Sequence, residues 1–518
     1  MKRHFFSAVS LAVFGLAGFA WAADDLVVQT ISGSVRGHAN ANYTEWLGIP
    51  YAAAPVGDLR WRAPQAAPKW SGVRDASNAG NGCVQGTGWD PGYEEPTLTE
   101  DCLYINVYRP HAASADAKLP VFLWIHGGGL RGGAGFDTDP RKFVSLGNVV
   151  FVTFNYRLSA LGFLAIPALT AEDRDAVGNY GLLDQQAAIR WVHENIANFG
   201  GDPEQVTIAG QSAGASSVCS QLASPSNKGL FVRAFHQSGG CNSISIAEAE
   251  SAGAGFAAVL GCENAANAAT CLRGKSATEI LAAYDKVRIS STVFGGGHFP
   301  LHPAEAIRSG AFNRVPIVMG QTHDERTQSM FAARDFQGKP VTVSQYEAEI
   351  RERYGAQAGE VLQLYPVADY WSPTIALATV EGDDRSCQRL ALYEDFAAHT
   401  PTYVYEFDER QAPAFVSIWR LNTDFPFGAT HVNELGYIFD YLRQALPLSS
   451  AQGELSDTMI SYWSTFTRSG NPNGAYTPDW PQYSAQSRAM MSLKSSGSAA
   501  KTSFADEHKC EFWRNQAG

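Results

Sequence analysis

One serine in this sequence lies in a glycine-flanked pattern that is typical of a nucleophile. Ser212 stands at the centre of "GQSAG", which begins at Gly210 and ends at Gly214. A serine hydroxyl is a weak nucleophile near neutral pH, so it needs a base that takes its proton and an acid that orients the base. The alternative is a small residue in a tight turn. A β-branched stretch before the serine and a helix-forming stretch after it favour a nucleophile elbow.

The base is expected among the histidines that follow residue 212, because the chain order at such an elbow is serine, acid, histidine. His236 falls inside a predicted strand and is expected to be a core residue. His431, in "FPFGATHVNELGYIF", lies in a glycine-containing loop after a predicted strand, where a late loop can reach the edge of a sheet. We therefore expect His431 to be the base. The other histidines in this part of the chain are His298, His302, His323, His399 and His508.

Two neighbouring carboxylates are candidates for the acid. Asp324 and Glu325 follow the apolar run "VPIVMG" closely, beyond the carboxyl end of a predicted strand. Position along the chain does not separate the two. A solvated acidic pair on the surface is the alternative interpretation of both.

A glycine tract upstream of the serine offers backbone donors for negative charge that develops on an attacked carbonyl oxygen. His126-Gly127-Gly128-Gly129 follows the buried run "VFLWI" directly and matches the HGGG-type oxyanion motif. Phosphate binding is the rival, but the tract lacks the following Lys-Ser/Thr and the GxGxxG spacing. A second tract, Gly295 to His298, follows no buried strand and is expected to be a flexible loop.

The elements that must hold these residues alternate between buried strands and helices. Runs that are apolar on both faces predict central strands of a parallel sheet. "LLDQQAAIRWVHENIANF" carries Leu183, Ala187, Trp191 and Ile196 at four- or five-residue spacing, which predicts a helix with one buried face. The sequence thus predicts an α/β fold in which helices flank a large, mostly parallel central sheet. Its strands are expected at residues 119–125, 148–157, 205–210, 232–239, 314–320 and 402–408.

Length, charge and the N-terminal segment limit the class of protein. At 518 residues and 45% hydrophobic the chain can bury a large core, and its net charge of −12 makes nucleic-acid binding a poor prospect. Residues 1–22 combine two basic residues, an apolar run and "AWA", which predicts a secretory signal. A membrane anchor is disfavoured because the run is shorter than the roughly 20 residues of a span. We expect a secreted or periplasmic protein without stable membrane insertion, and one domain over 23–518 with capping insertions around 242–307 and 322–401.

Eight cysteines would then lie in an oxidising compartment, where disulfides persist. The absence of a CxxC pair argues against a zinc site. Short closed loops, such as Cys83 to Cys102 and Cys262 to Cys271, are natural disulfide candidates, although the sequence alone does not fix the pairing.

Together these motifs resemble the type-B carboxylesterase family of α/β-hydrolases, which includes cholinesterases and several secreted lipases. The resemblance covers most of the chain after residue 22. It is carried by "GIPYAAAPVGDLRWRAP", "EDCLYINVYRP", "NYRLSALGFL", the stretch from Gly178 to Gly214, and "FTRSGNPN". It implies an α/β-hydrolase fold and a serine carboxylesterase that acts on small-molecule esters through an acyl-enzyme, without metal or organic cofactor.

The resemblance also implies a role for individual residues. Because the family's acid is usually glutamate, it favours Glu325 over Asp324. The implied nucleophile, acid and base are Ser212, Glu325 and His431; the implied oxyanion donors are the N–H groups of Gly128, Gly129 and Ala213; Ser238 is implied to support the acid. The implied disulfides are Cys83–Cys102, Cys262–Cys271 and Cys387–Cys510, which leaves Cys219 and Cys241 unassigned.

Some residues depart from the family pattern. Cholinesterases carry glutamate before the nucleophile, whereas this chain has Gln211, and Trp89 in the short Cys83–Cys102 loop does not align securely with their choline-binding tryptophan. Choline esters are therefore not the expected substrates. Arg326 replaces the usual glycine after the acidic pair and is expected to reshape that loop. A lipase or polyester-active hydrolase is the alternative enzyme, and a binding protein without catalysis is a remote one, since serine and histidine are both present.

Overall fold

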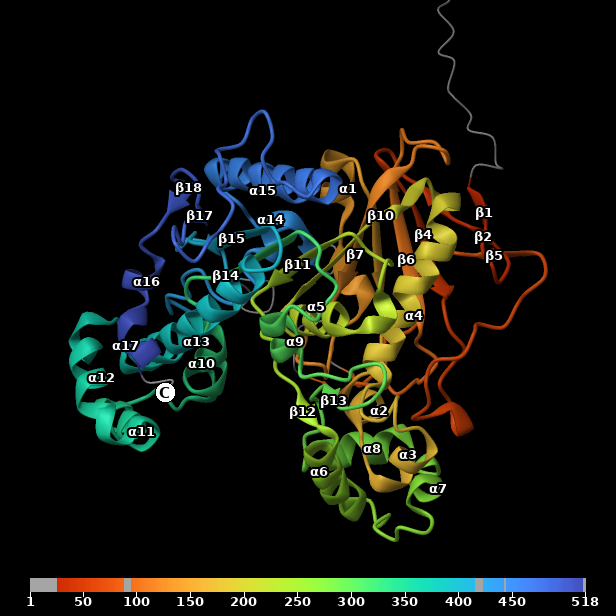
Figure 1. The fold of residues 1–518 in the computed structure, drawn as a ribbon, viewed down its shortest axis with the longest axis horizontal. Helices are drawn as coiled ribbons and strands as arrows, with labels where there is room; N and C mark the ends of the chain where they lie inside the picture. The colour runs from red at the N-terminus through yellow and green to blue at the C-terminus, as the bar shows by residue number, and fades with distance from the viewer. Residues whose placement is uncertain (1–25, 88–94, 415–422, 442–443, 516–518) are drawn as a thin grey trace, which may run out of the picture.

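The centre of the molecule, a computed structural model that describes residues 26–87, 95–414, 423–441 and 444–515, is an eleven-stranded mixed sheet (Figure 1). The seven strands from β17 to β9 run parallel, and antiparallel strands extend the sheet at both ends. Across the sheet the strands are β18 (Ala499–Lys501), β17 (Met490–Leu493), β15 (Thr402–Phe407), β14 (Ile317–Thr322), β11 (Arg233–Gln237), β10 (Gly201–Gln211), β7 (Leu119–Ile125), β9 (Val150–Phe154), β6 (Tyr104–Pro110), β4 (Tyr43–Pro50) and β3 (His38–Ala39).

This sheet confirms the predicted α/β fold. All six predicted strands are present, as β7, β9, β10, β11, β14 and β15, with ends that differ by a few residues. The predicted helix is α4 (Tyr180–Asn195), which a 3-10 turn continues over Ile196–Phe199. The antiparallel strands β4 and β6 were not predicted.

Alternate side chains of the strands enter two separate cores. Val121, Leu123 and Ile125 of β7 belong to an aliphatic-rich core beneath α4, α5 (Ala213–Ala223) and α13 (Pro373–Ala397). Phe122 and Trp124 point to the opposite face, where α1 (Arg141–Gly147) and α15 (Ser450–Ser469) cover an aromatic-rich core. Burial on both faces explains why these strands are apolar throughout.

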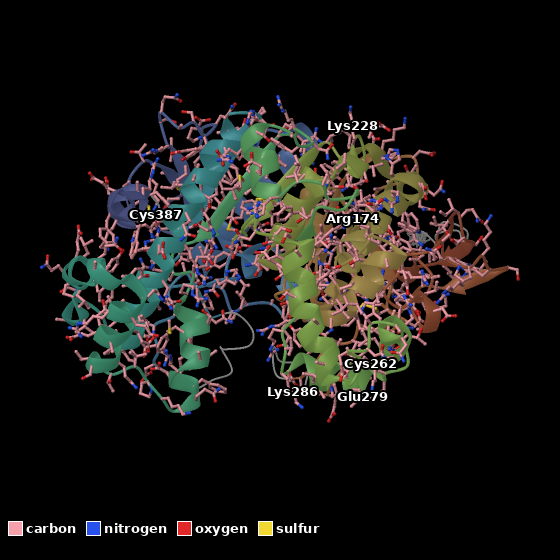
Figure 2. The ribbon with its side chains drawn as sticks, turned by 60° about the horizontal axis from the view of Figure 1, so that its bottom comes forward. Arg174, Lys228, Cys262, Glu279, Lys286 and Cys387 are labelled. Carbon is pink, nitrogen blue, oxygen red and sulfur yellow. A yellow bond between two sulfur atoms is a disulfide. The ribbon has the colours of Figure 1, made fainter. Side chains whose placement is uncertain are left out.

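Helices outside the two covering layers form groups near the lower edge of the view in Figure 1. One group contains α6 (Ile246–Val259), α7 (Ala268–Arg273) and α8 (Ala277–Tyr284), with Cys262 and Glu279 among its side chains (Figure 2). Another contains α10 (Thr327–Ala333), α11 (Val343–Tyr354) and α12 (Ala358–Leu364) beside α13. The shorter elements include β8 (Thr138–Asp139), β13 (Val293–Phe294), α14 (Leu435–Ile438), β16 (Asp440–Tyr441) and α17 (Cys510–Asn515).

Four disulfides join the eight cysteines, so the described residues contain no free cysteine. Three are the implied pairs, and the fourth joins Cys219 of α5 to Cys241, the two cysteines that remained unassigned; the four are Cys83–Cys102, Cys219–Cys241, Cys262–Cys271 and Cys387–Cys510. None of the helices in the described part of the chain is both long enough and apolar enough to cross a membrane. The predicted signal at 1–22 and Trp89 lie outside the described residues.

Candidate active site

The carboxyl ends of neighbouring parallel strands bring the predicted site residues to one edge of the sheet. β7 ends before the glycine tract, β10 ends at Gln211 before Ser212, and β14 ends shortly before Glu325. Parallel strands that are neighbours end at the same edge, which is where α/β sheets form their sites. A cavity of about 550 Å³ opens there, and Ser212 and His431 both line it.

Ser212 sits in a sharp turn that requires the two flanking glycines. Its backbone has φ 57° and ψ −122°, a strained conformation for a residue with a side chain. A Cβ on Gly210 would lie 2.5 Å from the backbone of Gly214, and one on Gly214 would lie 2.1 Å from the carbonyl oxygen of Ile125. The Ser212 N–H donates to the carbonyl of Gln237 at 2.8 Å and so fixes the turn against β11.

His431 is oriented by Glu325. Nδ1 of His431 lies 2.6 Å from Oε2 of Glu325, and the carboxyl group is buried at 4% exposure. Since an ionised carboxylate only accepts hydrogen bonds, Nδ1 carries the proton and Nε2 keeps its lone pair. The next residue, Val432, has φ 73°, which is unusual for a β-branched residue and marks a loop held under strain.

Asp324, the other candidate acid, anchors the histidine loop instead. Its Oδ2 accepts the Ala429 N–H at 2.8 Å, and Nε of Arg410 lies 2.6 Å from the same oxygen. Its own N–H donates to the Ala429 carbonyl at 2.8 Å. The two acids therefore have different contacts. Glu325 contacts the imidazole ring of His431, and Asp324 binds the backbone of the loop that carries this histidine.

Gln211 contacts the imidazole of His431 at the ring nitrogen that faces away from Glu325. Its side-chain Nε2 lies 3.2 Å from Nε2 of His431, and the residue is buried at 2% exposure. Among the hydrogen bonds of the described residues, none joins Ser212 Oγ to His431. Hydrogen bonds between nucleophile and base are often long in unliganded enzymes and shorten when substrate binds.

Arg389 is a site residue that the sequence analysis missed. Its Nη1 lies 3.1 Å from Oε1 of Glu325, and it also donates to the carbonyl of Gly239. Burial alone would raise the pKa of Glu325, but the charges of Arg389 and His431 hold that pKa well below its usual range. Arg389 comes from α13, whose mixed pattern of charged and apolar residues gave no sign of this role.

Glu434 is a second missed residue, three positions after His431. It is fully buried beside the polar side chain of Gln237, and no ion pair among the described residues involves its carboxyl group. Burial, together with the nearby charge of Glu325, raises the pKa of Glu434 to about 8. A glutamate in the otherwise apolar "ELGYIF" was the signal that could have identified it, because buried carboxylates without a cation are rare.

The glycine tract places free backbone donors beside the serine. Gly128 has φ 96°, and a Cβ on it would lie 2.1 Å from the carbonyl oxygen of Gly132. A Cβ on Gly127 would lie 3.3 Å from that of Ser212, so the tract passes directly over the serine. Among the hydrogen bonds of the described residues, none uses the N–H of Gly128, Gly129 or Ala213. Ala213 is the first residue of α5, and the N–H groups in the first turn of a helix have no partner within the helix.

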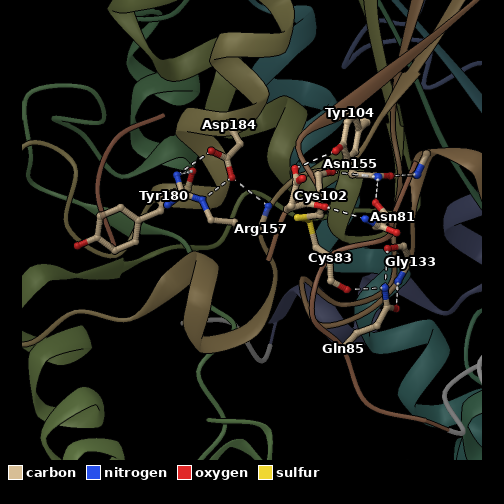
Figure 3. The surroundings of a disulfide bond; sticks show 12 residues. Asn81, Cys83, Gln85, Cys102, Tyr104, Gly133, Asn155, Arg157, Tyr180 and Asp184 are labelled. Carbon is tan, nitrogen blue, oxygen red and sulfur yellow. Dashed lines mark hydrogen bonds and ion pairs between the residues drawn. A yellow bond between two sulfur atoms is a disulfide. The ribbon is translucent and has the colours of Figure 1, made fainter. Parts of the chain in front are cut away.

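The Cys83–Cys102 disulfide supports the far end of this tract (Figure 3). Gln85, two residues after Cys83, accepts the Gly133 N–H at 2.8 Å and donates to the Gly133 carbonyl at 3.2 Å. His126, at the start of the tract, is buried against the ring of Tyr156, and this burial lowers its pKa to about 4. A neutral His126 is therefore a packing residue of the tract.

The other predicted residues occupy supporting or unrelated positions. His236 is in the core at 1% exposure, as expected, and His298 lies after β13 and does not line the catalytic cavity. Ser238 has φ 54°, and its buried hydroxyl lies near Glu325, where it stabilises the ionised carboxylate and helps to lower the pKa of that group. Arg326 forms an ion pair with Glu381 of α13 at 2.9 Å.

One cluster has the residue types of a metal site. His323, Glu406 and His508 place ligand atoms within 4.8 Å of one another. Both ring nitrogens of His508 are already engaged, at 2.6 Å from Asp383 and from Glu406. Burial lowers the pKa of His508, but these two carboxylates raise it to about 10. An imidazolium has no lone pair for a metal, so the cluster is an ion-pair network.

Comparisons with known proteins identify the family of the chain. The carboxylesterase family model matches residues 24–513. The chain is 32% identical to para-nitrobenzyl esterase of Bacillus subtilis, over 90% of this chain and 95% of the relative, and 32% identical to human cocaine esterase, over 92% and 88%. A solved PNB esterase structure superposes with a TM-score of 0.77 at 30% identity, over 94% of this chain and 99% of the other. The chain therefore belongs to the carboxylesterase family and is a hydrolase of carboxylic esters.

Proposed function

We propose that the protein hydrolyses small carboxylic esters through a covalent acyl-enzyme formed on Ser212. Oγ of Ser212 attacks the ester carbonyl carbon while Nε2 of His431 takes its proton, and Glu325 stabilises the imidazolium that results. The N–H groups of Gly128, Gly129 and Ala213 receive the oxyanion.

The acyl-enzyme then forms and breaks down through three further proton transfers that involve His431. His431 gives its proton to the departing alcohol oxygen as the carbon–oxygen bond breaks, which leaves the acyl group on Ser212. It next takes a proton from water as the water attacks the acyl carbonyl, and it returns that proton to Ser212 Oγ as the acid leaves. No step in this sequence requires a cofactor.

The observation that carries the proposal is the 2.6 Å contact between His431 and Glu325 on the wall of the cavity that Ser212 lines. It supports a base with a defined tautomer next to a serine in a strained turn. The volume of about 550 Å³ supports a small-molecule substrate. The four disulfides support a site of action in an oxidising compartment, outside the cell or in a periplasm.

A single substitution tests the proposal. We expect Ser212→Ala to abolish turnover of p-nitrophenyl acetate while the far-UV circular dichroism spectrum stays that of the wild type. The matched control is Ser226→Ala, which removes the hydroxyl of an exposed serine outside the cavity. Residual turnover in Ser212→Ala above a few per cent of the wild-type rate would refute the assignment.

A further inference from the structure

Two arginines line the same cavity as the candidate nucleophile. Arg131 lies two residues after the glycine tract, and Arg288 follows α8. Both also line an adjoining cavity of about 250 Å³, so they mark the place where the two cavities meet. The chain as a whole carries a net charge of −12, which repels anions, so these arginines are a local exception near the reacting centre.

Arg131 reaches back over the oxyanion donors. The position that a Cβ would take on Gly129 is 3.5 Å from Nε of Arg131, so the arginine side chain lies against that glycine. Its backbone is fixed by an N–H bond of 3.1 Å to the Gly128 carbonyl. Within the described part of the chain, no carboxylate forms an ion pair with Arg131, and no hydrogen bond uses its guanidinium.

Arg288 is held by an aromatic ring rather than by a strong ion pair. Its guanidinium carbon lies 4.9 Å from the centre of the Tyr284 ring. Asp285 approaches it at 3.7 Å, but these side chains are 56% and 75% exposed, and such pairs contribute little. Tyr284 itself is 5% exposed, and its hydroxyl has no hydrogen-bond partner among the described residues. The Tyr284 ring therefore holds the Arg288 guanidinium on this wall, while the hydroxyl oxygen itself is buried.

Three carboxylates line the two cavities. Asp440 belongs to β16, which pairs with β8, and Asp137 directly precedes β8. Asp137 accepts the Ala134 N–H at 2.8 Å. Asp285 lines the adjoining cavity and forms the weak, exposed pair with Arg288. The junction of the two cavities therefore carries two arginines and one carboxylate, which leaves it with a net positive charge.

We propose that Arg131 and Arg288 form an anion-binding subsite, and that the preferred substrates are esters that carry a carboxylate on the group reaching toward that junction. Guanidinium groups bind carboxylates through paired hydrogen bonds, and the Tyr284 ring holds the Arg288 guanidinium at the junction. This inference rests on the proposed function, because it concerns the specificity of the same serine.

Matched pairs of esters test the subsite. 4-Acetoxybenzoate and 4-acetoxybenzamide differ by a charge on the alcohol side, and monoethyl succinate and ethyl succinamate differ by the same charge on the acyl side. We expect the wild type to favour the anionic member of at least one pair in kcat/KM. In the double variant Arg131→Gln/Arg288→Gln, kcat/KM for the anionic ester divided by kcat/KM for its neutral counterpart should fall by about tenfold or more. The main cause should be a higher KM for the anionic ester. Added salt should lower the ratio in the wild type and much less in the variant.

Arg174→Gln is the control, since Arg174 is exposed and does not line either cavity (Figure 2); its ratio should equal that of the wild type. If the neutral esters are hydrolysed but the wild type shows no anionic preference, or the double variant keeps the wild-type ratio, the subsite is refuted while the proposed function stands. If none of the four esters is hydrolysed in a manner that depends on Ser212, the proposed function itself fails.

Discussion

The side-chain amide of Gln211 lies 3.2 Å from Nε2 of His431, the ring nitrogen that faces away from Glu325. In the proposed mechanism this nitrogen receives the proton of Ser212, so the residue before the proposed nucleophile directly contacts the proposed base. Because the Gln211 amide is neutral, the charged group that contacts the imidazole is Glu325, on the opposite side of the ring. The identity of residue 211 therefore influences the protonation of the base as well as the shape of the cavity.

Gln211→Glu should move the acid limb of the pH–rate profile to higher pH. A carboxylate at this distance stabilises the protonated imidazole, which cannot act as a base, so activity at pH 6–7 falls and recovers at higher pH. We expect a displacement of about one pH unit in kcat/KM. Gln211→Leu, which removes the amide without adding charge, should not show the upward displacement. An acid limb of Gln211→Glu that coincides with the wild-type limb would contradict the geometry.

Glu325→Gln and Asp324→Asn should have very different effects, although the two acids are adjacent. Loss of the Glu325 charge removes the partner of His431 Nδ1 and should lower kcat by about 10³- to 10⁴-fold. Asp324→Asn weakens the contacts with Arg410 and Ala429, so we expect a lower melting temperature and less than about a tenfold loss of kcat. Steady-state kinetics and thermal melts on the same preparations separate the two effects. The reverse ranking would transfer the role of the acid to Asp324.

Gly128→Ala should disable the oxyanion donors. The new Cβ would lie 2.1 Å from the Gly132 carbonyl at a φ of 96°, so the tract must move. We expect kcat to fall by about 100-fold or more, as for the loss of one oxyanion donor. The control is Gly255→Ala in α6, where no heavy atom lies within 4 Å of the new Cβ and φ is not positive. Equal kcat values for the two variants would show that the tract does not serve the reaction.

Glu434→Gln should change the pH dependence of stability. With its pKa raised from 4.5 to about 8, Glu434 keeps its proton in the folded state over a range in which the unfolded chain releases it. The wild type therefore loses stability from this group as pH rises from about 4.5 to 8, by up to about 1.4 kcal/mol per pH unit.

The glutamine variant lacks this titration. Its melting temperature relative to that of the wild type should rise progressively between pH 5 and pH 8 and change little above pH 8. Thermal melts across pH 5–9 measure this difference. A difference that stays constant with pH would mean that Glu434 titrates normally.

The sequence predicts best those strands whose apolar residues reflect burial in the folded chain. β7, β10 and β14 are apolar on both faces because two helix layers cover them, so their runs were visible in the sequence. The residues at their carboxyl ends follow from the strands, which is why Ser212 and the glycine tract could be placed. The choice of Glu325 over Asp324 came from family resemblance, since both follow the same strand.

The residues that were missed owe their place in the site to tertiary structure. Arg389 comes from the middle of α13, far along the chain from Glu325. Glu434 lies close to His431 in the sequence, but its burial follows from packing that no local period encodes. Arg131 and Arg288 are far apart in the sequence and line the same two cavities only in the folded chain. The residues proposed to bind an anion are thus less visible in the sequence than those proposed to carry the reaction.

The most direct test of the account is to locate the covalent adduct of a fluorophosphonate probe. After incubation with the wild type, intact-protein mass spectrometry should show one adduct, and peptide mapping should place it on Ser212. Ser212→Ala should remain unlabelled under the same conditions, while Gln211→Leu should still react. An adduct on another residue, or equal labelling of Ser212→Ala, would contradict the claim that Ser212 is the nucleophile.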